Sequence, residues 1–139
     1  MRALIDQGAL CGGSGIHDPV RAEHDKLSTP GRDLDYQLTE AGQALLERLE
    51  VDIPQTRRRL IAYCVDWTEQ SHHLGGALGA ALLTRIEVLG WVRRGERGAP
   101  RAVAITPTGA DGFAEVFGID TTTLATPTQP QQAQRARPR

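Results

Sequence analysis

The chain has 139 residues, of which 40% are hydrophobic and 24% are charged, and its formal net charge at pH 7 is -1. This balance is typical of an ordinary globular protein and excludes nucleic-acid binding through overall basicity, so any such surface must be local. Aromatic residues make up only 4% of the chain, which argues against base stacking on aromatic side chains. The two cysteines stand in unrelated contexts, which favours reduced thiols over a disulfide framework. No apolar run approaches the roughly 20 residues of a membrane span and no signal peptide is visible, so we expect a cytoplasmic protein without membrane association.

The first part of the chain is predicted to contain two helices joined by a long loop. Residues 1–10 read as the end of a helix that Gly8 closes. Residues 11–34 are rich in Gly, Pro, Asp and Ser without periodicity, which is typical of a loop. A short strand at 36–38 then leads into a helix that begins after Thr39, a favourable N-cap residue.

A helix-turn-helix is predicted next. Residues 54–69 are expected to form its first helix, with Pro54 in the first turn. The side chains expected to face inward from this helix are Leu60, Ile61, Cys64, Val65 and Trp67. Glycines at positions 75, 76 and 79 predict a sharp turn, because a residue without Cβ fits there. Residues 80–89 carry apolar side chains at three- and four-residue spacing, which predicts a second helix that ends at Gly90.

A basic hairpin and a last helix complete the pattern. Residues 91–94 are expected to be extended, Gly95 suits the tip of a hairpin, and residues 102–105 alternate as a return strand would. Thr106 and the proline after it then start a helix that ends before Gly118. This order of elements is that of a winged helix-turn-helix, a fold used mostly on DNA.

The chain also contains an internal repeat. Leu38–Gly42 (LTEAG) matches Ile105–Gly109 (ITPTG), and each segment leads into a helix. Self-similarity in a fixed order indicates a duplicated supersecondary unit. We therefore expect a mainly α fold with small β-hairpins (α+β), in which a winged helix-turn-helix accompanies a partial second copy. The expected divisions are a partial winged-helix-like unit at 1–53 with its loop at 11–34, a winged helix-turn-helix-like domain at 54–119, and a disordered tail at 120–139.

Part of the chain resembles a known family of regulators. The resemblance rests on stretches that read YQLTEAGQALLERL, CVDWTEQSHHLGGALGAALL, GWVRR and ITPTG. Residues 36–119 resemble the C-terminal part of bacterial winged helix-turn-helix transcriptional regulators of the ArsR (arsenic-repressor) type. The resemblance implies a homodimer that binds double-stranded DNA. It also implies an N-terminal base-reading module, which is expected to be missing from this chain.

Arginines supply the candidate DNA contacts. On the second helix of the predicted helix-turn-helix, Arg85 is a candidate base reader, although the nearby Glu87 would repel phosphates. The hairpin is better suited, because cationic side chains on a wing neutralise phosphates. Its candidate residues are Arg93, Arg94, Arg97 and Arg101. A merely solvated hairpin, with its charge partly offset by Glu96, stays open as the alternative.

Cys64, His72 and His73 form a candidate metal site, because thiolate and imidazole are good ligands for zinc-like ions. Metal-responsive repressors are common in the resembling family, so a metal ion is a candidate effector, and no other cofactor is expected. A tetrahedral site would need further ligands, which would have to come from Cys11, His17 or His24 in the loop, or from a second subunit. The structural alternative is favoured, since a cysteine on an apolar stripe acts mostly as a small hydrophobic residue.

An enzyme is not expected. Asp66 and Glu69 are close in sequence, but no nucleophile, phosphate-binding glycine loop or metal triad accompanies them. The leading hypothesis is a winged-helix transcriptional regulator, or its C-terminal portion, that binds DNA chiefly through the wing arginines. The alternative is a non-catalytic dimerisation or effector-sensing module without its own DNA binding.

Overall fold

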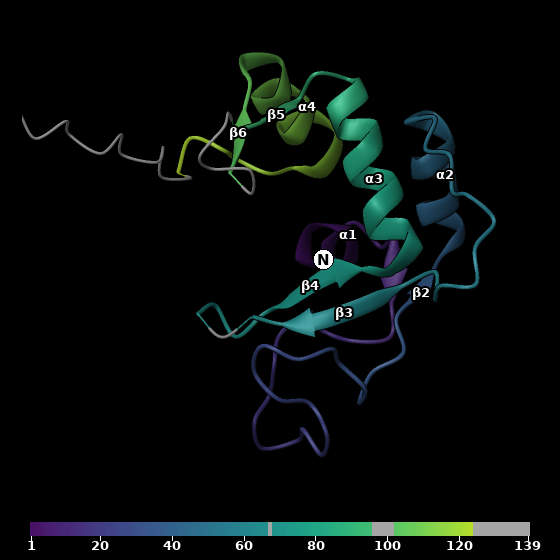
Figure 1. Ribbon diagram of the computed structural model, residues 1–139, viewed down its shortest axis with the longest axis vertical. Helices are drawn as coiled ribbons and strands as arrows, with labels where there is room; N and C mark the ends of the chain where they lie inside the picture. Colours follow the sequence, from purple (N-terminus) through teal and green to yellow (C-terminus); the bar gives the residue numbers. More distant parts are fainter. Residues whose placement is uncertain (67, 96–101, 124–139) are drawn as a thin grey trace, which may run out of the picture.

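The computed structural model describes residues 1–66, 68–95 and 102–123 (Figure 1). These residues form four helices and three antiparallel two-stranded hairpins. In chain order the elements are α1 (Arg2–Asp6), β1 (Leu10–Cys11), β2 (Gln37–Leu38), α2 (Glu40–Arg48), β3 (Ala62–Val65), β4 (His72–Gly75), α3 (Gly76–Val88), β5 (Val92–Arg94), β6 (Val103–Ile105) and α4 (Pro107–Phe117). The observed class is mixed α+β, as the sequence predicts, and the small hairpins are compatible with a winged helix.

The order helix, hairpin, helix occurs twice, as α1–β1–β2–α2 and as α3–β5–β6–α4. The hairpin of β3 and β4 stands between the two copies in the chain. In Figure 1 the second copy rises from the end of β4, and α2 runs beside α3. The element order predicted from the internal repeat is therefore present.

The same threonine contact begins the last helix of each copy. Thr39 Oγ1 accepts a hydrogen bond from the backbone of α2 and donates one to the carbonyl oxygen of Gly8 at 2.6 Å. Thr106 Oγ1 likewise accepts a hydrogen bond from the backbone of α4 and donates one to the carbonyl oxygen of Gly90 at 2.7 Å. Each threonine thus caps a helix and ties it to the end of the preceding helix, which explains why the Thr-x-x-Gly pattern recurs.

A glycine in the first turn of each of these helices permits close contact with the residue directly before the first strand of the preceding hairpin. A Cβ on Gly42 would lie 2.2 Å from the carbonyl oxygen of Ala9, and a Cβ on Gly109 would lie 1.9 Å from that of Trp91. These distances are far shorter than van der Waals contact. The glycines of the two repeated motifs are therefore required by packing between helix and strand.

The predicted helix at 54–69 is wrong. Residues 51–61 contain neither helix nor strand, residues 62–65 form β3, and Trp67 lies outside the described residues. Side chains in β3 alternate, with Tyr63 and Val65 buried and Cys64 exposed. The apolar residues of this segment fit a strand period of two as well as a helical period, and pairing with β4 decides between them.

The start of α3 shows why the segment before β3 stays irregular. The N–H groups of Ala77 and Leu78 donate to the carbonyl oxygens of Arg59 and Leu60 at 3.0 and 2.9 Å. These carbonyl groups satisfy helix donors that have no partner within α3. Gly76 turns the chain from β4 into α3 with φ +77°. The predicted turn between two helices is thus a corner between a strand and a helix, and no helix precedes α3 directly within the described residues.

Residues 12–36, which make up most of the predicted loop at 11–34, contain no helix and none of the strands β1–β6, whereas Cys11 belongs to β1. This loop pairs with both edges of the β3–β4 hairpin through isolated bridges, Ile16 with Ser71 and Pro30 with Cys64. In Figure 1 it lies on the side of the hairpin opposite α3. A loop held on both edges of a hairpin is a fixed part of the fold.

The hydrophobic core draws on both predicted domains. One cluster joins Leu10 and Leu45 with Leu78, Trp91 and Phe117. Residues on either side of the predicted boundary at 53 therefore share a core.

No helix within the described ranges is long and apolar enough to cross a membrane. The predicted disorder of 120–139 concerns a segment that, from residue 124 onward, lies outside the described residues.

Candidate functional site

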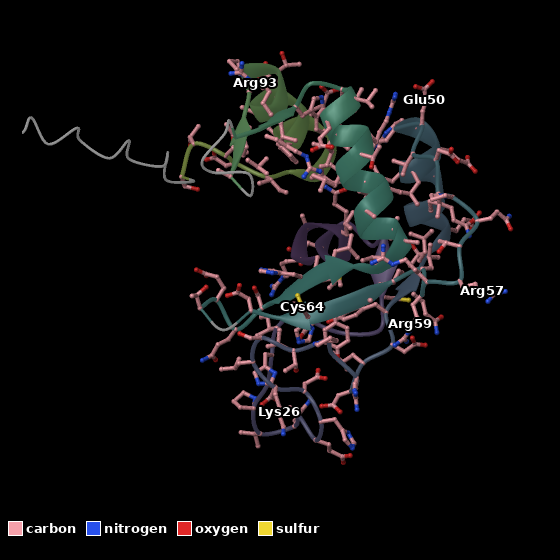
Figure 2. All side chains as sticks on the ribbon, viewed as in Figure 1. Lys26, Glu50, Arg57, Arg59, Cys64 and Arg93 are labelled. Atoms are coloured by element: carbon pink, nitrogen blue, oxygen red, sulfur yellow. The ribbon has the colours of Figure 1, made fainter. Side chains whose placement is uncertain are left out.

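The β5–β6 hairpin carries the described part of the predicted basic surface. Val92 pairs with Ile105, and its buried side chain anchors the hairpin to the core. Arg93 is exposed, and Figure 2 shows it at the end of the molecule farthest from the long loop. Arg94 is also exposed, and its Nε donates to Glu87 Oε1 at 2.5 Å. Within the described residues, Arg94 thus has an acidic partner and Arg93 has none.

The other two predicted wing residues, Arg97 and Arg101, lie outside the described residues. Their proposed contact with DNA stays a prediction. Glu96, whose charge would partly offset that of the arginines, lies in the same segment.

Arg85 does not project freely from α3. Its Nε donates to the carbonyl oxygen of Leu49 at 2.6 Å, and its guanidinium pairs with Glu50 Oε2 at 2.5 Å. Leu49 is the C-cap of α2, where backbone carbonyl groups lack helical partners and favour a cation. The Arg85 side chain is only 23% exposed. The contacts of Arg85 thus join α3 to α2, and they occupy the groups that base reading would need.

The predicted metal ligands do not form one cluster. Cys64 and His73 are cross-strand neighbours with exposed side chains, whereas the side chain of His72 is buried. His73 Nε2 lies 3.5 Å from Asp66 Oδ2. Among the described residues, no group of three or more His, Cys, Asp or Glu side chains could hold a metal ion. A metal site on Cys64 and His73 would need ligands from elsewhere and stays a prediction.

His72 belongs to a buried polar network that the sequence analysis missed. The hydroxyl group of Tyr36 accepts a hydrogen bond from the N–H of Gly15 at 3.0 Å and lies 2.7 Å from His72 Nδ1. Burial lowers the pKa of His72 from its ordinary value, so the ring is neutral at pH 7. Tyr36 and His72 are both more than nine-tenths buried.

Tyr63 makes a second contact of the same form. Its hydroxyl group accepts a hydrogen bond from the N–H of Leu34 at 3.0 Å and donates one to Asp25 Oδ2 at 2.5 Å. Burial, together with the hydrogen bond to Asp25, raises the pKa of Tyr63 to about 12. Tyr63 stacks edge-on against Tyr36, with ring centroids 5.3 Å apart. The two tyrosines therefore hold the loop against the hairpin from within.

Asp25 and Asp33 shape the loop itself. The Asp25 carboxylate accepts hydrogen bonds from the N–H groups of Arg32 and Asp33. Burial raises the pKa of Asp25, but these hydrogen bonds and that from Tyr63 outweigh burial, so the pKa lies below its usual value. The N–H groups of Asp25 and His24 donate to the Asp33 carboxylate and lower its pKa to about 2. Both carboxylates are ionised at pH 7 and are used as acceptors.

A cavity of about 280 Å³ adjoins this network. Its lining includes Ile16, His17, Ala22, Asp25, Leu34 and His72. The sequence gives little indication of this cavity and its network. The Asp and His residues of the loop stand singly, and the tyrosine of β3 lies far from them in the chain. Only the pairing of the loop with the hairpin brings them together.

Comparison with known proteins gives one informative similarity. The chain is 36% identical over 90 residues to an uncharacterized HTH-type transcriptional regulator, YdfF, of Bacillus subtilis (strain 168). The aligned part is 63% of this chain, and it spans 39% of the length of that protein. No protein family and no solved structure matches the chain. The similarity supports a relationship to a helix-turn-helix transcriptional regulator, and it agrees with the expectation that the chain is not an enzyme.

Proposed function

We propose that this chain is a DNA-binding winged-helix transcriptional regulator of the ArsR type, or its C-terminal portion, and that it acts in the cytoplasm as a homodimer on double-stranded DNA. The similarity to a helix-turn-helix regulator supports the general class. The order α3, β5, β6, α4 is compatible with a winged helix. The chain is a binding protein and has no catalytic role.

The hairpin of β5 and β6 is the proposed DNA contact. The main supporting observation is that Arg93 is exposed, while Val92, its neighbour in the same strand, is buried in the core. A cation on a fixed strand contacts a phosphate at a small cost in conformational entropy. Arg94 is proposed as a further contact that the ion pair with Glu87 orients. Arg97 and Arg101 would extend the same basic surface.

The test compares two exposed arginines that lie far apart in Figure 2, Arg93 and Arg57. Binding of a fluorescein-labelled duplex is followed by fluorescence anisotropy at low salt. We expect Arg93→Ala to weaken binding several-fold, because it removes a phosphate contact. Arg57→Ala removes the same charge from the irregular segment before β3 and should leave affinity unchanged. Equal affinities for wild type and both variants would refute the wing contact.

The second candidate is a non-catalytic dimerisation or effector-sensing module without its own DNA binding. The observation that favours it is the cavity beside His72, on the strand that leads into α3. Light scattering of the chain, with and without duplex DNA, separates the two candidates. A dimer whose mass does not change with DNA supports the second candidate, and a rise by the mass of one duplex supports the first.

A further inference from the structure

The cavity between the loop and β4 has the properties of a small-molecule site. Its volume of about 280 Å³ is close to the lower end of ligand pockets, which measure about 300–1,000 Å³. Ile16, Ala22 and Leu34 give it apolar walls, and His17 and His72 add imidazole groups. Its walls are held in place by the hydrogen bonds of Tyr36 and Tyr63, so the cavity is formed before any ligand arrives.

His72 supplies a hydrogen-bond donor at this site that has no partner. Among the described residues the Tyr36 hydroxyl group has two hydrogen-bond partners, the N–H of Gly15, which donates to it, and His72 Nδ1. Nδ1 is the one of the two that can accept, so the hydroxyl proton goes to it. The proton of the neutral imidazole is then on Nε2. This nitrogen is buried, and no hydrogen-bond partner for it exists among the described residues. Buried donors without a partner are uncommon in folded proteins, and a bound acceptor would satisfy this one.

The charges at the cavity limit the kind of ligand. One cation, Arg21, lines the cavity, and its Nε lies 3.6 Å from Oδ2 of Asp18, which also lines it. Asp25 and Asp33 add two further negative charges, which disfavour an anion. Their oxygen atoms already accept hydrogen bonds from backbone N–H groups of the loop. A cationic ligand would therefore find few free acceptors and would leave the donor of His72 unpaired.

We propose that the cavity binds a small uncharged organic molecule, whose carbonyl-type oxygen accepts a hydrogen bond from His72 Nε2 and whose apolar body packs on Ile16 and Leu34. This site goes beyond the proposed DNA contact and does not depend on it. His72 lies in β4, which continues directly into α3. An occupant of the cavity would therefore contact the strand that positions the first helix of the second copy.

Three compounds of nearly equal shape test the site, namely benzamide, benzoate and benzamidine, which are neutral, anionic and cationic at pH 7. Each is titrated into the isotopically labelled chain without DNA, and backbone amide signals are followed by NMR. We expect saturable shifts with benzamide, centred on Gly15, His17 and His72, and clearly weaker binding of the two charged compounds. Stronger binding of benzoate or benzamidine would overturn the proposed ligand class.

Matched variants locate the binding. Ala22→Phe fills the cavity from its wall, whereas Val20→Phe places the same side chain at a position of the same loop that is 92% exposed. We expect the first change to abolish the benzamide shifts and the second to preserve them. Absence of saturable shifts in the wild-type chain, or shifts that persist in folded Ala22→Phe, would overturn the site. If Ala22→Phe does not fold, the wild-type titration alone still tests whether benzamide binds. Failure here would leave DNA binding untouched, because no DNA is present.

Discussion

Tyr63→Phe removes one buried hydroxyl group with little change of shape. The ring of Tyr63 keeps its packing, but two hydrogen bonds disappear, one donated to Asp25 at 2.5 Å and one accepted from the N–H of Leu34 at 3.0 Å. The first is to an ionised carboxylate and contributes about 1.5–3 kcal/mol, and the second contributes about 1 kcal/mol. We therefore expect a loss of about 2–4 kcal/mol in the free energy of unfolding at pH 7.

The loss should depend on pH in a definite direction. The pKa of Asp25 in the folded chain lies below its ordinary value of 3.8. A carboxyl group with a lowered pKa stabilises the fold above the unfolded pKa, and this stability is lost as the pH falls through the folded pKa. Because Tyr63 supplies part of that lowering, the difference between Tyr63→Phe and wild type should be complete at pH 7. It should shrink below about pH 4.

Urea unfolding followed by circular dichroism at pH 7 and near pH 3 measures both effects. Tyr36→Phe is the matched control, since its hydroxyl group lies against the neutral ring of His72 and not against a carboxylate. Its difference from wild type should show no decrease that tracks the titration of Asp25. The reasoning is refuted if Tyr63→Phe is as stable as wild type at pH 7, or if its deficit is the same at both pH values.

Two further changes test the packing of α4 within the second copy and the place of α3. Gly109→Ala would put a Cβ 1.9 Å from the carbonyl oxygen of Trp91, so we expect a loss of about 3 kcal/mol or more in urea unfolding; a loss below about 1 kcal/mol would contradict this contact. Arg85→Ala removes the bond to the carbonyl oxygen of Leu49, and we expect a loss of about 1–2 kcal/mol. Glu50→Gln should cost much less, because the Glu50 side chain is 77% exposed. Similar losses for Arg85→Ala and Glu50→Gln would contradict the role of the carbonyl contact.

Local signals in the sequence predict the repeated units well. Thr39 and Thr106 stand at helix starts because their hydroxyl groups satisfy N–H groups of the first turn, a rule that needs no knowledge of tertiary structure. Gly8 and Gly90 end the preceding helices with positive φ. The class of the fold and the order of its repeated elements follow from such rules.

The helix prediction for the segment around β3 fails for a physical reason. Ile61, Tyr63 and Val65 alternate, but Leu60 and Cys64 also give a helical spacing, so periodicity supports both structures. The choice depends on pairing with β4 and on bridges to a loop more than thirty residues earlier. A rule that considers one segment at a time cannot include those partners.

The cavity is hidden from the sequence for the same reason. The sequence groups His72 with Cys64 and His73, because these residues are close in the chain. In a strand, however, neighbouring side chains point to opposite faces, and His72 faces the loop while His73 faces solvent. The partner of His72 is Tyr36, which no spacing rule connects to it.

The salt dependence of DNA binding tests the central claim most directly. Affinity for a duplex is measured between about 50 and 200 mM salt for wild type, Arg93→Ala and Arg57→Ala. Our account predicts a steep decline for wild type, with a slope that falls by about 1 in Arg93→Ala, as expected for one lost phosphate contact, and does not change in Arg57→Ala. A flat response in wild type, or the same slope in all three proteins, would contradict a DNA contact through the β5–β6 hairpin.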